Sequence, residues 1–133
     1  MKFPDREWAE AFCSNLNNSP EYRTSASRWV WDIAFLVVNI PQEVGVGEKA
    51  AVKFRLSHGA CHGVEFYTDD RVEAPYILEA DYKTWIDVIT GKFQPIPAIA
   101  LGRIKLKRGS FATLVQYATA ALAMIKEAQK LGL

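Results

Sequence analysis

Hydrophobic and polar positions alternate along the middle of the chain. Strict alternation over residues 51–57 and 103–107 predicts two half-buried strands, because successive side chains of a strand point to opposite faces. Residues 27–39 also read as a strand, and from Ile33 onward both of its faces are apolar. A strand that is apolar on both faces is expected at the centre of a sheet.

Two further strands are predicted at residues 64–68 and 75–80. The first returns along residues 51–57 as an antiparallel hairpin, with the turn at residues 58–60. The second begins with proline, at the strand position where a missing N–H costs least. The chain therefore predicts five strands.

Helical spacing of apolar residues predicts two helices ahead of the strands. Pro4 suits the first turn of a helix whose apolar stripe continues to Leu16. Ser19 and Pro20 form an N-cap and first-turn pair, which predicts a short second helix through about Ser25.

A third helix is predicted between the last two strands. Asp81 is its expected N-cap, and Gly91 is expected to end it where φ turns positive. Pro95 and Pro97 are expected to forbid a regular helix until after Pro97, which leaves about one helical turn over residues 98–101.

The last helix is predicted to begin after Ser110 and to be apolar on more than one side. Its main stripe is expected to comprise Phe111, Leu114, Val115, Ala118, Leu122 and Ile125. Ala120, Ala123 and Met124 add apolar surface on another side. A helix this apolar requires more than one apolar neighbour, such as a core together with a ligand, a lid or another subunit.

The order of these elements predicts an α+β fold, because helices do not alternate regularly with strands. We expect a five-stranded mixed, mainly antiparallel sheet with helices packed on one face. A chain of 133 residues suits a single domain over residues 1–133.

Composition narrows the class of function. A net charge of +1 argues against a nucleic-acid binder that relies on bulk charge. The longest apolar run, residues 33–38, is far shorter than the ~20 residues of a spanning helix, and no secretory signal is visible. Cys13 and Cys61 are too few for a disulfide framework, so we interpret them as reduced thiols of a cytoplasmic protein.

One stretch carries a family resemblance. An aromatic-bearing helix with Tyr82 and Trp85 is followed by Gly-Lys-Phe-x-Pro, an Ala/Ile/Leu turn and the run Gly-Arg-Ile-Lys-Leu-Lys-Arg-Gly before the terminal helix. This order resembles the sterol carrier protein type 2 family, in stand-alone form. The resemblance is strongest over residues 82–109 and covers nearly the whole chain, with Arg103 where lysine is more usual.

The resemblance implies non-enzymatic binding, with transfer as a further role, of a hydrophobic ligand in a tunnel between sheet and helices. The implied ligands are a fatty acid, acyl-CoA, a sterol or an isoprenoid. No cofactor, metal or catalytic residue is implied. Apolar side chains also dominate every converging surface, as is typical of a small-molecule pocket. The residues that we predict to line the tunnel, each of which is equally explicable as plain core, are Trp31, Ile33, Phe35, Phe54, Leu56, Trp85, Ile89, Ile104, Leu106, Phe111, Val115 and Leu122. Ala120 and Met124 are candidates for a movable lid.

Three alternatives remain at this stage. The second apolar side of the last helix, taken with Leu36 and Val38, favours a dimerisation or interaction module on the same fold. His58, Cys61 and His62 are zinc-ligand types, but their spacing matches no standard knuckle. An enzyme with Cys61 as a nucleophile activated by His62 is disfavoured, because adjacent residues of a strand point to opposite faces. We therefore interpret these residues as a turn with a semi-buried thiol. The basic edge at residues 103–108 is a solvated strand face, a site of transient contact with anionic lipid surfaces, or a site that attracts a CoA-type phosphate.

Overall fold

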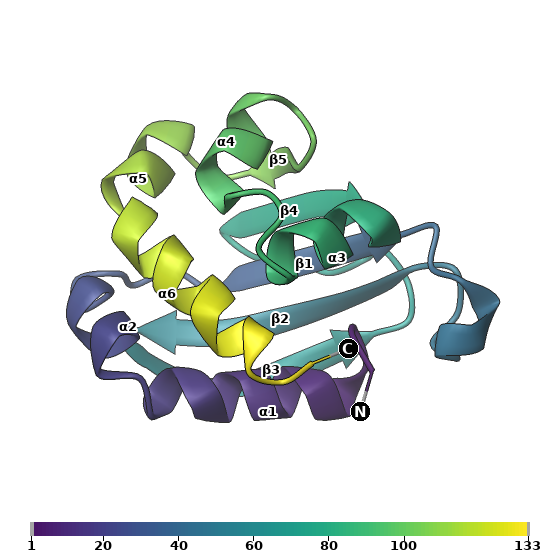
Figure 1. Ribbon diagram of the computed structural model, residues 1–133, viewed down its shortest axis with the longest axis horizontal. Helices are drawn as coiled ribbons and strands as arrows, with labels where there is room; N and C mark the ends of the chain where they lie inside the picture. The colour runs from purple at the N-terminus through teal and green to yellow at the C-terminus, as the bar shows by residue number, and fades with distance from the viewer. Residues whose placement is uncertain (1, 133) are drawn as a thin grey trace.

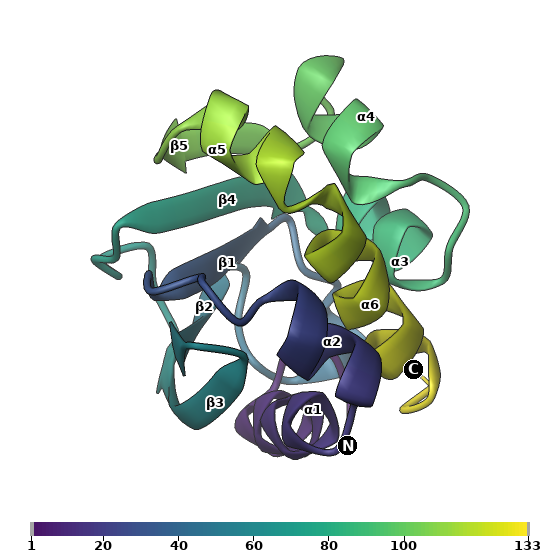
Figure 2. The same ribbon diagram turned by 90° about the vertical axis from the view of Figure 1, so that its left-hand side faces the viewer.

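The structure is a computed structural model that describes residues 2–132. Five strands form one sheet in the order β3-β2-β1-β4-β5, and the helices cover one face of it (Figures 1 and 2). The pair β1–β4 is parallel and the other neighbouring pairs are antiparallel. The predicted α+β fold with a mixed, mainly antiparallel sheet is therefore confirmed.

Strand β1 is central in the sheet and buried on both faces, as its two apolar faces predicted. In β1 the side chains of Ile33, Phe35 and Val37 join the main core, whereas Ala34 and Leu36 face a smaller cluster on the other side of the sheet. The strands are β1 (Ile33–Val38), β2 (Ala50–Ser57), β3 (Ala60–Tyr67), β4 (Tyr76–Asp81) and β5 (Lys105–Arg108).

The described residues also form six α-helices and a short 3-10 helix. They are α1 (Arg6–Asn17), α2 (Pro20–Ser25), η1 (Gln42–Val44), α3 (Tyr82–Ile89), α4 (Pro95–Ala100), α5 (Phe111–Gln116) and α6 (Ala118–Gln129). The predicted caps are confirmed: the Asp81 carboxylate accepts from the Thr84 N–H, and the Ser110 hydroxyl from the Thr113 N–H. Gly91 follows α3 with φ 87°, as predicted for its end.

Several elements differ from their predicted bounds. Strand β3 begins at Ala60 rather than at residue 64, and α1 begins at Arg6, so Pro4 precedes the helix instead of lying in its first turn. The central strand begins at Ile33 rather than near residue 27, because the chain turns at Trp29, whose N–H donates to the Ala26 carbonyl. Helix α4 begins at Pro95, and Pro97 lies inside it. The prediction that both prolines exclude a helix was wrong, since first-turn N–H groups have no intrahelical acceptor and are not needed there.

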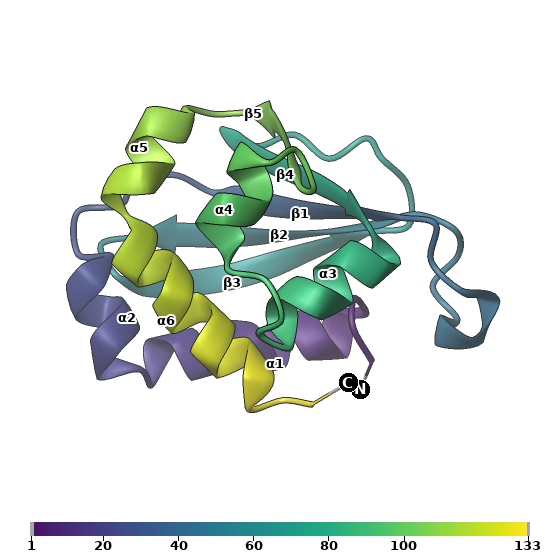
Figure 3. The same cartoon turned by 45° about the horizontal axis from the view of Figure 1, so that its top comes forward.

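The last predicted helix is broken in two at Tyr117, which has φ −108° and ψ 26°. The Tyr117 N–H donates to the Leu114 carbonyl, which closes α5 with a tighter turn before α6 starts in a new direction. Figure 3 shows a short connection leading from β5 into α5, and α6 running across the helical layer toward α1. The break gives the end of the chain a bend that periodicity does not predict.

The core between sheet and helices is aromatic where α1 lies on the strands. Phe12 stacks on Trp8 with ring centroids 5.1 Å apart and meets Phe54 of β2 edge-on at 5.2 Å. Phe35 of β1 packs against Phe54 at 5.2 Å and against Trp85 of α3 at 4.7 Å. These rings fix α1 and α3 on the central strands.

The prediction of two reduced thiols was wrong, because Cys13 and Cys61 form a disulfide. Helix α1 lies along β3, the edge strand, and brings the two Cα atoms within 5.4 Å across 48 residues of sequence. The Asn17 side chain extends this junction, since it donates to the Cys61 carbonyl and accepts from the Cys61 N–H, each at 2.8 Å. The cysteine argument for a cytoplasmic location thereby loses its basis, and the compartment stays a prediction. Within residues 2–132, no helix is long and apolar enough to span a bilayer.

Candidate functional site

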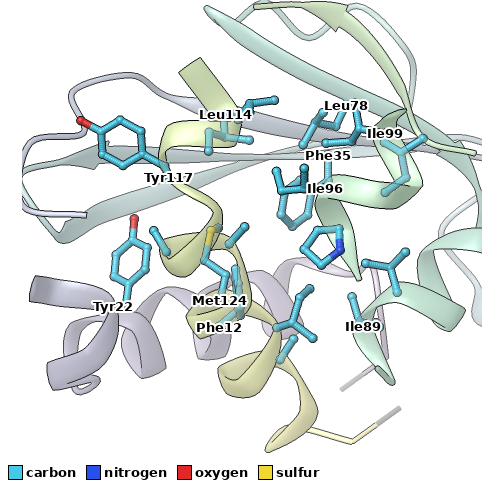
Figure 4. A pocket seen from close by; sticks show the side chains of 18 of the residues that line it. Phe12, Tyr22, Phe35, Leu78, Ile89, Ile96, Ile99, Leu114, Tyr117 and Met124 are labelled. Atoms are coloured by element: carbon cyan, nitrogen blue, oxygen red, sulfur yellow. The ribbon is translucent and has the colours of Figure 1, made fainter. Parts of the chain in front are cut away.

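The candidate site is an apolar cavity between the sheet and the helices. Ile33 and Phe35 of β1 and Leu78 of β4 form its floor. Helices α1, α2 and α3 supply walls, and the α4–α6 segment closes it from the far side of the helical layer. Figure 4 shows Tyr22 and Tyr117 at one end of the cavity and Ile89, Ile96 and Ile99 at the other.

Every side chain that lines the cavity is aliphatic, aromatic or the thioether of Met124, and none is charged. The lining is Trp8, Phe12, Tyr22, Ala26, Trp29, Ile33, Phe35, Leu78, Trp85, Val88, Ile89, Pro95, Ile96, Ile99, Ile104, Leu114, Tyr117, Ala120, Ala121, Met124, Ile125 and Ala128. This surface favours a hydrocarbon guest, because apolar surface gains free energy when it leaves water.

The volume of the cavity is ≈ 80 Å³. Small-molecule sites in proteins usually enclose roughly 300–1,000 Å³. The cavity as it stands therefore accommodates only a fragment of a lipid chain, and a whole chain requires neighbouring elements to separate. The partly exposed side chains of Ile96, Ile99, Met124 and Ile125 place the rim between α4 and α6.

Polar groups at the lining are few and buried. The Tyr22 side chain is almost fully buried, and burial raises the pKa of its hydroxyl to about 12, so the group is neutral at physiological pH. The indole N–H of Trp8 is buried and has no hydrogen-bond partner among residues 2–132. A buried donor without an acceptor costs about 1–3 kcal/mol.

The structure brings together five of the residues predicted to bind the ligand and separates the others from the cavity. Those at the lining are Ile33, Phe35, Trp85, Ile89 and Ile104. Those away from it are Trp31, Phe54, Leu56, Leu106, Phe111, Val115 and Leu122. Phe54 and Leu56 are buried in the core, whereas Phe111, Val115 and Leu122 are exposed. Their roles in binding stay predictions.

Sequence reasoning did not select the lining residues of α1 and α2. Trp8, Phe12 and Tyr22 precede the strands by many residues, and their stripe has the spacing of any core-facing helix. Ala120 and Met124, predicted as a lid, do line the cavity from α6. No signal in the sequence separates cavity lining from solid core, since both require apolar side chains.

The structure does not support the alternative readings of Cys61 as a nucleophile or of the His58–His62 turn as a metal site. Cys61 is in the disulfide, so it offers no free thiolate as a nucleophile or metal ligand. Among residues 2–132, no group of three or more His, Cys, Asp or Glu side chains lies close enough to hold a metal ion.

The apolar residues that suggested a dimer surface do not share a face. Leu36 is buried on the far side of the sheet against the segment at Val72 and Ala74, whereas Ala120 and Ala123 are buried in the main core. A homodimer itself stays a prediction.

Solved structures similar to this chain match nearly its whole length. A crystal structure of sterol carrier protein 2 matches with a TM-score of 0.88 at 36% identity, covering 97% of this chain and 98% of that chain. The solution structure of a conserved hypothetical protein from Thermus thermophilus, a candidate sterol carrier protein, has a TM-score of 0.88 at 37% identity, covering 98% and 90%.

Sterol carrier protein 2 from Yarrowia lipolytica, in its apo form, shares the fold at 16% identity with a TM-score of 0.57, covering 92% of this chain and 88% of that chain. No sequence profile of a known family matches this chain, and no curated protein matches it significantly.

Proposed function

This chain belongs to the sterol carrier protein 2 family, and from that premise we propose that it binds a hydrophobic lipid in the cavity and transfers it without a catalytic step. The observation that carries the proposal is the uncharged lining enclosed between sheet and helices. A buried methylene gains about 0.8 kcal/mol, so fifteen carbons contribute roughly 12 kcal/mol before the entropy costs of binding. Such a ligand needs no catalytic group to be held.

Entry of the ligand requires the ≈ 80 Å³ cavity to grow, and we infer that the terminal helices move to admit it. Tyr117 separates α5 from α6 and also lines the cavity, so rotation at this residue changes the position of both helices. Helix α4 has six residues, and its Ile96 and Ile99 line the cavity. Short elements that no disulfide links to the rest of the fold are expected to separate from it at low free-energy cost.

The chemistry of the lining constrains the head of the ligand. Because no charged side chain faces the cavity, a carboxylate or a CoA phosphate would lie outside it while the chain is buried. Fatty acids, acyl-CoA, sterols and isoprenoids all have an uncharged hydrocarbon part that suits the cavity. Transfer between membranes also requires transient contact with a lipid surface.

Native mass spectrometry of gently extracted protein tests the proposal directly. We expect a bound lipid, and we expect unlabelled lipids to displace a fluorescent fatty acid at micromolar protein. A panel that varies chain length at a constant head, and head at a constant chain length, identifies which part of the ligand sets the affinity. Neither bound lipid nor displacement by any member of the panel would contradict the proposal.

A pair of variants on α6 locates the binding site. Ala121→Trp places a large ring at a partly exposed position of the lining and is expected to weaken displacement at least about tenfold, because the ring occupies the space of the chain. Thr119→Trp adds the same ring two residues earlier at an exposed position outside the lining and is expected to leave binding unchanged. Equal effects of the two substitutions would place the ligand elsewhere.

A further inference from the structure

The charges of the chain are strongly asymmetric although their sum is near zero. Residues 88–126 contain six Lys and Arg residues and no Asp or Glu, so the net charge of +1 conceals a basic segment within an otherwise acidic chain. Lys92, Lys107 and Lys126 pair with carboxylates of other segments. Lys105 and Arg108 are exposed and form no ion pair within residues 2–132. These two cations are available to an anionic partner.

The same segment holds most of the exposed apolar surface. Among the described residues, five large apolar side chains are strongly exposed, and four of them lie between residues 101 and 122. They are Leu101 at 74%, Phe111 at 38%, Val115 at 46% and Leu122 at 42%. Exposed apolar side chains grouped with cations are unusual for a surface that faces only water.

Leu122 belongs to α6, whereas Leu101, Phe111, Val115, Lys105 and Arg108 belong to α4, β5 and α5 or directly follow them. These three elements lie at the same end of the molecule (Figures 1 and 2). Phe111 of α5 lines an open groove together with Leu106 and Lys105 of β5. Ile99 and Ile104 line both this groove and the internal cavity. The exposed apolar and cationic surface is therefore continuous with the wall of the cavity.

We propose that the α4–β5–α5 end docks on an anionic lipid membrane. Leu101, Phe111 and Val115 enter the boundary between headgroups and acyl chains, while Lys105 and Arg108 meet the anionic headgroups. Charge complementarity selects this occupant, because the segment offers cations and no carboxylate next to aliphatic side chains. This inference rests on the proposed function. If the protein transfers lipids, docking at this end lets a lipid pass between the bilayer and the cavity with little exposure to water.

Co-sedimentation with vesicles tests the docking. Wild-type protein is expected to bind vesicles of phosphatidylcholine mixed with phosphatidylserine more tightly than vesicles of phosphatidylcholine alone, and to lose binding as salt rises. The double variant Lys105→Ala/Arg108→Ala is expected to bind the anionic vesicles about 25-fold more weakly, since each cation near the surface is worth roughly fivefold. Leu101→Ser is expected to weaken binding at least about tenfold and, being exposed, to leave folding intact.

The matched control is Arg23→Ala/Lys83→Ala, which removes two exposed cations from α2 and α3 and is expected to leave vesicle binding within about twofold. Thermal unfolding verifies that each variant is folded. An equal loss in the control, or no preference of the wild type for anionic vesicles, would overturn the docking inference.

The fluorescent fatty-acid assay in solution separates the two proposals. Retained displacement in Lys105→Ala/Arg108→Ala with loss of vesicle binding supports the docking surface. If the wild type does not bind vesicles but unlabelled lipids still displace the fluorescent fatty acid, the docking inference is wrong and the proposed function is unaffected. Vesicle binding without any displacement contradicts the proposed function instead.

Discussion

The two ends of the helical layer are held to the sheet in different ways. The anchored region, which we define as α1 with β1, β2 and β3, is joined by the disulfide Cys13–Cys61 and by the two hydrogen bonds of Asn17. The terminal region, defined as α4, β5, α5 and α6, consists of two six-residue helices, a four-residue strand and one longer helix that starts at a break. No disulfide ties the terminal region to the sheet within residues 2–132.

The difference indicates how the same fold combines a stable core with the proposed lipid-binding site. The aromatic core of the anchored region keeps the floor of the cavity in place, because closely packed rings do not rearrange cheaply. The terminal region contributes the opposite wall and contains the break at Tyr117. The cavity is expected to open in the terminal region, which has no disulfide among the described residues. The following predictions test this difference between the two regions.

The largest effect is expected from removing a ring of the anchored region. Phe12→Ala deletes a fully buried ring that contacts Trp8 and Phe54 and is expected to lower the free energy of unfolding by about 3–5 kcal/mol. Urea denaturation monitored by circular dichroism measures the loss. Phe111→Ala in the terminal region is the matched control and is expected to cost under about 1 kcal/mol, since that ring is exposed. Similar costs at both positions would remove the distinction.

Removing the disulfide is expected to have the next largest effect. Cys13→Ala/Cys61→Ala is expected to lower the free energy of unfolding by about 2–4 kcal/mol, because the cross-link constrains a long loop of the unfolded chain. Denaturation with and without dithiothreitol measures it, and the reductant should lower the stability of the wild type only. A wild type that is insensitive to the reductant while reduction is verified by mass would contradict the anchoring role.

The buried hydroxyl of Tyr22 predicts a loss of stability at alkaline pH. Its pKa is raised from 10.0 to about 12 in the folded state, so folded and unfolded chains are both protonated below pH 10 and its contribution is then fully present. Between pH 10 and 12 only the unfolded chain loses the proton, and the free energy of unfolding falls by roughly 2–3 kcal/mol.

Denaturation at a series of pH values, compared with Tyr22→Phe, measures this contribution. The variant has no proton to lose at this position and should show a smaller decline above pH 10. The same decline in both proteins would mean that Tyr22 is not the group responsible.

The smallest effect is expected at an exposed position of α6. Leu122→Ala retains a good helix former and is expected to change the free energy of unfolding by less than about 1 kcal/mol. Leu114→Ala, at a buried position of α5 that lines the cavity, is the comparison and should cost more. A larger loss at Leu122 would mean that the predicted stripe, rather than the observed one, faces the core.

Local signals in the sequence determined most of the elements. The caps Asp81 and Ser110 and the positive φ at Gly91 follow from side chains and backbone freedom at single positions. Alternation in β2 and the 103–107 segment predicted the buried side chains Phe54 and Ile104, and the two apolar faces of β1 predicted its central position. The order of these elements, and the resemblance of residues 82–109, sufficed to predict the fold class and the family.

Only the tertiary structure decided which apolar face of the last helix is buried. Leu122 faces outward and Ala120, Ala123 and Ala128 face the core, the reverse of what residue size alone favours. Small side chains let α6 approach the neighbouring helices closely, and that approach depends on elements from the opposite end of the chain. The disulfide and the set of cavity-lining residues were likewise decided by the tertiary structure. Both depend on contacts between segments that are far apart in the sequence, and hydrophobic periodicity does not reveal such contacts.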